Sequence, residues 1–323
     1  MIVTVGFNSG IESKYTVESL SRGADAGGGG GGGGGGSIPA VAVAAEHYAV
    51  GGAIAVTRAA AELGEETVVT GTIGGMTGQW LCGILSKDRI AHDFLQLNGD
   101  TPQNLIIVDQ ETQLTYRINQ PGLDFDANAA TRISEKINSL SQKGGVTVFS
   151  GALPTGISPD LYVGLIRKTA QQGALTVLNS SGVPIQQVLP ARPHMIVISR
   201  PDLEAWLGMQ NCALDQLLEG VVEISLTGSE IVALSLGTEG AVIAWDKDVY
   251  MAQPPTVETV NPEGCEDILT AGFAVGLARR WGAQETIRTA MAAVIANVIA
   301  AKPGRLRLLD VEALWEQIQV DPI

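Results

Sequence analysis

This chain of 323 residues has few aromatic side chains, few cysteines and no excess of positive charge. Aromatic residues make up 5% and hydrophobic residues 45%, so aliphatic side chains supply most of the core, as is typical of parallel strands covered by helices. Cys82, Cys212 and Cys265 lie far apart without paired spacing, which suggests neither a disulfide framework nor a zinc site and favours a reducing cytoplasm. The formal charge of −14 argues against nucleic acid as a partner and leaves small phosphorylated ligands open.

The sequence also shows no sign of a targeting segment or of a membrane-spanning helix. Residues 1–7 carry no basic region ahead of an apolar core, so they predict a first strand and not a signal peptide. The most apolar long stretch, 290–301, contains Asn297 and is shorter than the roughly 20 residues that a spanning helix needs. We therefore expect a soluble, cytoplasmic protein without a membrane partner.

Two common catalytic motifs are absent. The chain has no Gly-x-Ser-x-Gly turn for a serine hydrolase and no Gly-x-x-x-x-Gly-Lys-Ser/Thr loop. His47, His92 and His194 show no helical pairing and no nucleophile partner, which indicates structural roles. Phosphoryl transfer by positioning and a single carboxylate base is the chemistry that remains.

What is present is an alternation of helix and strand from about residue 124. A helical pattern over 127–141, a buried strand over 146–149 and a loop over 150–156 predict a doubly wound α/β domain. Ligands in such sheets bind beyond the carboxyl ends of the strands. The ten consecutive glycines at 27–36 are followed by no helix, so we expect a flexible insertion there and not a phosphate loop.

The stretch 257–276 predicts a helix N-terminus directly after a β-type run. The backbone amides of Gly264, Cys265 and Glu266, called the anion hole below, would be free to hold phosphoryl oxygens. Asp267 would lie beside them as a base. An acidic residue in a helix's first turn is also a common stabilising device, and the spacing alone leaves both interpretations open.

The segment Val-Asn-Pro-Glu-Gly-Cys-Glu-Asp-Ile-Leu-Thr-Ala-Gly-Phe at 260–273 resembles the signature of the ribokinase and phosphofructokinase B sugar kinases. That family has Asn-Thr-x-Gly-Ala-Gly-Asp-x-x-x-Ala-Gly-Phe here, and the resemblance implies that Asp267 deprotonates the sugar hydroxyl beside an anion hole. Cys265 replaces the family's Ala and Glu266 its Gly. A carboxylate at position 266 would repel a nucleotide phosphate if it pointed inward.

Further similar motifs keep the family's order from Met1 to about Leu314, among them the Gly51-Gly52 turn and Ser-Gly-Ala-Leu-Pro-Thr-Gly at 150–156. The resemblance implies one ribokinase-like domain over 1–323, with a doubly wound, mostly parallel sheet flanked by helices. It also implies a small β-sheet lid built from about 9–20, 38–50 and 95–120. The closest branch acts on phosphorylated hexoses, as 1-phosphofructokinase and tagatose-6-phosphate kinase do.

The resemblance assigns roles residue by residue. Asp202 would organise magnesium indirectly. Glu12 stands where the phosphosugar branch has an Asp that binds sugar hydroxyls, and an exposed strand-end carboxylate is the open alternative. The remaining substrate-binding candidates are Asn8, Gly51, Gly52 and Asn104, and the nucleotide-binding candidates are Asn179, Ser199, Ser235, Gly237, Gly240 and Asn297.

At four positions that are usually functional in the family, this chain has different residues, namely Ala53, Pro102, Ser199 and Glu266. Pro102 removes a probable phosphate-binding arginine. Two functions therefore stay open: a kinase that uses ATP and Mg2+ on a sugar or sugar phosphate, or a catalytically impaired member with a binding or assembly role. The expected partners are these small molecules and, through the lid, a second copy of the chain.

Overall fold

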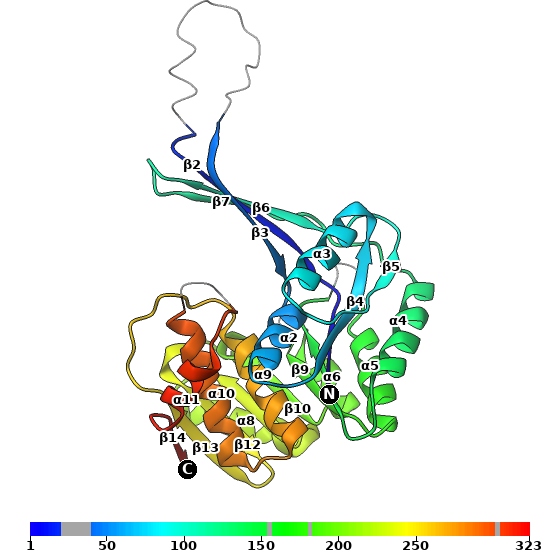
Figure 1. The fold of residues 1–323 in the computed structure, drawn as a ribbon. Helices are drawn as coiled ribbons and strands as arrows, with labels where there is room; N and C mark the ends of the chain where they lie inside the picture. The colour runs from blue at the N-terminus through cyan, green and yellow to red at the C-terminus, as the bar shows by residue number, and fades with distance from the viewer. Residues whose placement is uncertain (21–39, 154–156, 180–182, 301–303) are drawn as a thin grey trace, which may run out of the picture.

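The computed structural model describes residues 1–20, 40–153, 157–179, 183–300 and 304–323 (Figure 1). The predicted flexible insertion at 27–36 lies outside these ranges. In the described part the strands form a ten-stranded sheet, in the order β14-β13-β12-β11-β10-β9-β8-β1-β4-β5, and a four-stranded sheet, in the order β3-β2-β6-β7. This arrangement confirms the predicted α/β class with a separate small sheet.

The large sheet is mostly parallel because helices connect its central strands. β1 pairs in parallel with β4 on one side and with β8 on the other, so that Ile2 lies opposite both Thr67 and Val146. Only β12, β13 and β14 join by antiparallel pairing. Its strands are β1 (Ile2–Gly6), β4 (Thr67–Gly74), β5 (Leu95–Leu97), β8 (Val146–Ser150), β9 (Leu175–Asn179), β10 (Met195–Ser199), β11 (Ile231–Ser235), β12 (Ala241–Trp245), β13 (Asp248–Gln253) and β14 (Gln319–Pro322).

Helices cover both faces of this sheet (Figure 1). α2, α9 and α10 pack on one face, and α4 and α5 pack on the other. The helices are α2 (Gly52–Glu62), α3 (Gly75–Lys87), α4 (Ala127–Leu140), α5 (Asp160–Gln171), α6 (Ile185–Val188), α7 (Arg200–Leu207), α8 (Leu214–Gly228), α9 (Cys265–Arg279), α10 (Ala283–Val298) and α11 (Leu308–Trp315), with 3-10 turns η1 (Leu189–Ala191) and η2 (Gly237–Glu239).

α9 is the central helix of its layer. Its residues from Ile268 to Leu277 are all buried, in agreement with a sequence that is apolar on every side. Gly272 and Gly276 let α10 approach closely, because a Cβ at Gly272 would lie 2.4 Å from the Cα of Ala290. This packing fixes the position of the N-terminus of α9.

The small sheet projects from the large one and consists of β2 (Gly10–Val17), β3 (Ala42–Val50), β6 (Gln103–Asp109) and β7 (Thr115–Ile118) (Figure 1). We refer to this four-stranded sheet as the lid. One part of the predicted lid range was wrong: Leu95–Leu97 pairs in parallel with β4 and extends the large sheet. The physical reason is its buried Leu95, which packs with the core beside β1.

No helix in the described ranges is long and apolar enough to cross a membrane.

The three histidines each contact a neighbouring polar group. His47 hydrogen bonds with Ser13, His92 hydrogen bonds with the Ile90 carbonyl, and His194 lies 3.1 Å from Glu230, which agrees with structural roles.

Candidate active site

A cavity of about 610 Å³ opens at the carboxyl ends of the parallel strands, where doubly wound sheets bind ligands. Asn179, Ser199 and Ser235 end the neighbouring strands β9, β10 and β11, and α9 begins across from them. The cavity is lined by Gly52, Gly151, Asn179, Ser199, Arg200, Pro201, Ser235, Leu236, Gly237, Pro262, Gly264, Cys265, Glu266 and Asp267. The structure therefore brings the predicted base, the anion hole and four predicted nucleotide-binding positions to one pocket.

The N-terminus of α9 follows a tightly held loop. Gly264 has a φ of 75°, a left-handed conformation that glycine adopts without a Cβ penalty. The amides of Val260 and Asn261 both donate to the Val298 carbonyl, at 3.0 and 2.9 Å. Helix geometry leaves the first amides of α9 without intrahelical acceptors, and together with the helix dipole they suit an anion.

Asp267 lies at this N-terminus and receives two hydrogen bonds. Ser150 Oγ and Asn179 Nδ2 both donate to its Oδ1, each at 3.0 Å. Burial raises the pKa of Asp267 to about 6, although the two hydrogen bonds favour the charged form. A carboxylate with this pKa is ionised at neutral pH and can still accept a proton, which suits a general base.

The Gly51-Gly52 turn brings the start of α2 against this carboxylate. A Cβ at Gly52 would lie 2.5 Å from Ser150 Oγ and 3.0 Å from Asp267 Oδ1, so only glycine fits. Gly51 has a φ of 134°, a conformation that disfavours other residues. Steric fit and backbone conformation therefore explain why glycine stands at both positions, which the sequence motif alone did not explain.

Glu266 is partly exposed and lines the same pocket. Burial, and then the nearby charges of Asp202 and Asp267, raise its pKa. Glu266 therefore stands beside Asp267 in the lining of the pocket.

Asp202 lies in the first turn of α7. Ser199 Oγ donates to Asp202 Oδ2 at 2.6 Å and accepts from the Asp202 amide at 3.2 Å, which caps the helix. The cation that lines the pocket, Arg200, is paired with Glu204 at 3.0 Å. Asp202 thus lies near Glu266 and Asp267 without lining the pocket itself.

This donor set suits magnesium only in part. Oxygen ligands are what Mg2+ prefers, and it is commonly bound by one or two carboxylates together with substrate phosphates. Within the described ranges no group of three or more His, Cys, Asp or Glu side chains is arranged to hold a metal. The residues fit an ion that enters with the phosphates, and they do not fit a preformed metal cage.

The lid contributes a second set of polar side chains. Glu12 on β2 lies opposite Asn104 on β6, and both are partly buried. Arg117 on β7 lies 3.5 Å from Glu12 and 3.3 Å from Glu263, just before the anion hole. Burial raises the pKa of Glu12, and Arg117 opposes this shift. Asn8 is exposed beyond the end of β1, and its Oδ1 lies 3.3 Å from where a Cβ of Gly122 would be.

Two predicted nucleotide-binding residues do not line the pocket. Asn297 is fully buried, donates to the Glu263 carbonyl at 3.0 Å and accepts from the Gly304 amide at 2.7 Å. It supports the loop before α9 from behind. Gly240 has a φ of 111°, and a Cβ there would lie 2.0 Å from the Ala252 carbonyl, so it serves the packing of β13.

Two residues of the site were missed in the sequence. Ser150 was quoted only as part of a loop, yet it is the last residue of β8, at the edge where ligands bind. Arg117 falls in the range 95–120 that was expected to build the lid, and the period-two alternation of β7 would have placed it on the same face of the lid as Glu12. The position of each residue within its strand was the feature of the sequence that could have identified it as part of the site.

Comparison with known proteins gives three findings. The model of the pfkB family carbohydrate kinases matches residues 39–304. A tagatose-6-phosphate kinase of Staphylococcus epidermidis is 28% identical over 274 residues, which cover 84% of this chain and 87% of that protein. Two structures of Escherichia coli phosphofructokinase-2, each 22% identical and with 98% of both chains covered, match the fold. One holds fructose-6-phosphate, with a TM-score of 0.83, and the other is the tetrameric inhibited form, with a TM-score of 0.84.

Proposed function

Because the chain belongs to the pfkB family of carbohydrate kinases, we propose that it transfers a phosphoryl group from ATP to a hydroxyl of a sugar phosphate. The observation that carries this proposal is Asp267, which lies at the N-terminus of α9 beside unpaired amides. Its pKa of about 6 and its hydrogen bonds from Ser150 and Asn179 equip it as a base.

The reaction divides into roles for these groups. Asp267 takes the proton of the acceptor hydroxyl as that oxygen forms a bond to the γ-phosphorus of ATP. The bond between the γ-phosphorus and the bridging oxygen breaks, and ADP leaves. The amides of the anion hole stabilise the negative charge on the moving phosphoryl group. Magnesium supplies charge neutralisation on the phosphates when bound, and Asp202 is the residue that would hold it indirectly.

The acceptor's own phosphate needs a cation from the lid. Pro102 occupies the position of the family's arginine, so the candidate is Arg117, which pairs with both Glu12 and Glu263. Guanidinium groups bind phosphate with paired hydrogen bonds. Glu12 and Asn104 would then bind sugar hydroxyls. The tagatose-6-phosphate kinase among the relatives supports a hexose phosphate as acceptor.

The alternative function is a catalytically impaired family member with a binding or assembly role, and Glu266 is the observation that favours it. Glu266 lines the pocket, and a carboxylate that points inward there would weaken phosphate binding at the anion hole. The ionisable Asp267 with its two donors favours the active enzyme.

We also propose that two copies associate through the lid. The alternation of its strands places Tyr116 and Ile118 on the face opposite Glu12, and these side chains are 43% and 56% exposed. An uncovered apolar face of this kind marks an interaction surface. The tetrameric form of the phosphofructokinase-2 relative supports assembly in general.

We propose a cytoplasmic location as well. The free thiols of Cys82, Cys212 and Cys265 support it, because a reducing compartment keeps cysteines unpaired.

The test measures ADP release with ATP and Mg2+ against fructose 6-phosphate, fructose 1-phosphate, tagatose 6-phosphate and the corresponding free sugars, with Asp267→Asn as the control. A kinase releases ADP only with its acceptor, and it does so well above the control. If melting temperature rises with ligand but no turnover appears, the impaired-member alternative holds. If neither turnover nor a shift appears, both proposals are wrong.

A further inference from the structure

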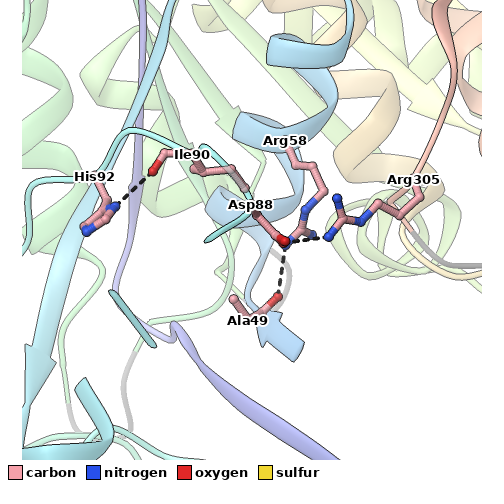
Figure 2. A network of polar contacts seen from close by, with 6 residues as sticks. All are labelled: Ala49, Arg58, Asp88, Ile90, His92 and Arg305. Atoms are coloured by element: carbon pink, nitrogen blue, oxygen red, sulfur yellow. Dashed lines mark hydrogen bonds and ion pairs between the residues drawn. The ribbon is translucent and has the colours of Figure 1, made fainter. Parts of the chain in front are cut away.

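Asp88 lies at the meeting point of three separate parts of the chain (Figure 2). It is the C-cap residue of α3, and its side chain is 20% exposed. Its Oδ2 lies 2.6 Å from Arg305 Nη2 and 3.5 Å from Arg58 Nη2. One carboxylate thus balances two guanidinium groups, from α2 and from the segment that follows α10.

The first branch of this cluster reaches the base of the lid. Arg58 Nη2 is 3.5 Å from the carbonyl oxygen of Ala49, the penultimate residue of β3 (Figure 2). The side chain of Arg58 is only 11% exposed, and burial, followed by the charge of Arg305, lowers its pKa. A nearly buried guanidinium without its carboxylate is costly, so Arg58 depends on Asp88. Two residues after Ala49 the Gly51-Gly52 turn begins.

The second branch reaches the anion hole. Arg305 follows Gly304, whose amide donates to Asn297 Oδ1 at 2.7 Å. Asn297 Nδ2 in turn donates to the carbonyl of Glu263 at 3.0 Å, directly before Gly264. Polar contacts, with one covalent step from Arg305 to Gly304, therefore join the base of the lid to the loop that presents the phosphate-binding amides.

We propose that Asp88 is a positioning residue that couples the lid to the anion hole, so that binding of the acceptor and binding of the nucleotide favour each other. The proposal rests on the proposed kinase function for the identity of the two ligands. The charge of Asp88 sets the positions of Arg58 and Arg305 together. With Asp88→Asn the two guanidinium groups lose their shared counter-ion and repel each other, and the two branches become independent.

The decisive measurement is the coupling factor, which is the ratio of the acceptor's dissociation constants without and with a saturating non-hydrolysable ATP analogue and Mg2+. Networks of this kind change coupling by roughly 2- to 30-fold when a member is altered, and we expect a loss of this size in Asp88→Asn. Asp88→Glu keeps the charge and should keep most of the coupling. Asp93→Asn, which breaks the ion pair with Lys136 elsewhere, is the matched control and should leave the factor unchanged.

A merely structural role for Asp88 would lower the melting temperature and leave the coupling factor at the wild-type value, and this result would overturn the proposal. A coupling factor of one in the wild-type protein would also overturn the proposal.

Hydrogen exchange on the free protein tests the network without any ligand, which separates this proposal from the kinase function. Asp88→Asn should speed exchange at residues 47–50 and at 260–264 together. Arg305→Met, at a residue that is 44% exposed, should speed exchange at 260–264 alone. If wild type binds no ligand, the proposed function fails while these exchange results still decide the network. Faster exchange in Asp88→Asn at only one of the two segments would refute the coupling.

Discussion

At the scale of single residues, we expect the protonation of Asp267, the proposed base, to set the pH range of the reaction. Its pKa of about 6 predicts that kcat/KM for the acceptor falls below about pH 6, because the base must be unprotonated. Ser150→Ala removes a hydrogen bond that favours the carboxylate, so the inflection should move to higher pH. Asp267→Asn should lower turnover by a factor on the order of 10² or more. Rate profiles between pH 4.5 and pH 9 check this.

A pH profile that is the same in Ser150→Ala as in wild type would show that another group limits the rate, and near-normal turnover in Asp267→Asn would exclude it as the base.

We expect Glu266 to limit how well the pocket holds a nucleotide. It lines the pocket near Asp202 and Asp267, where a carboxylate that points inward would compete with a phosphate for the positive end of α9. Glu266→Gly should tighten Mg-ATP binding and speed phosphoryl transfer, with some loss of stability from added backbone freedom. Glu266→Gln, which removes only the charge, should recover most of the gain. Calorimetric titration checks this, and unchanged or weaker nucleotide binding in both variants would contradict it.

At the scale of elements, the N-terminus of α2 and that of α9 are held at contact distance across the site. Gly52→Ala would place a methyl group 2.5 Å from Ser150 Oγ, which must displace the hydrogen-bonding partner of Asp267. A displacement of about 1 Å in a catalytic group costs on the order of 10²-fold in rate, and we expect a fall in kcat of this size. Gly164→Ala in α5, where a Cβ meets nothing within 4 Å, is the control and should keep full activity. Equal kcat in both variants would show that the contact is not needed.

The elements themselves could be predicted because their periodicity and punctuation are local properties of the chain. The buried α9 and the Gly51-Gly52 turn were expected where they occur. The buried position of Asn297 was not predictable, since it depends on contacts with residues distant in the sequence. β5 was assigned to the lid because a short strand gives no sign of which sheet it joins.

At the scale of the whole molecule, the apolar face of the lid should form an interface. We expect a dimer by light scattering after size-exclusion chromatography, and Ile118→Lys should shift it toward monomer, because a lysine cannot be buried there without a partner. Leu226→Lys in α8, at a residue that is 83% exposed, is the matched control and should not change the mass. A wild-type monomer, or a dimer that survives Ile118→Lys, would place the interface elsewhere or exclude it.

The order of strands in the large sheet has a consequence for the growing chain on the ribosome. β1 pairs with β4 on one side but with β8 on the other, and the residues opposite Ile2 are Thr67 and Val146. A nascent chain can therefore assemble β1, β4 and the lid early, while the second edge of β1 stays open until β8 has emerged. Such distant pairing slows folding and leaves an apolar edge exposed to aggregation. The proposed base arrives later still, at position 267, so we expect no phosphoryl transfer from a nascent or truncated chain that stops before α9.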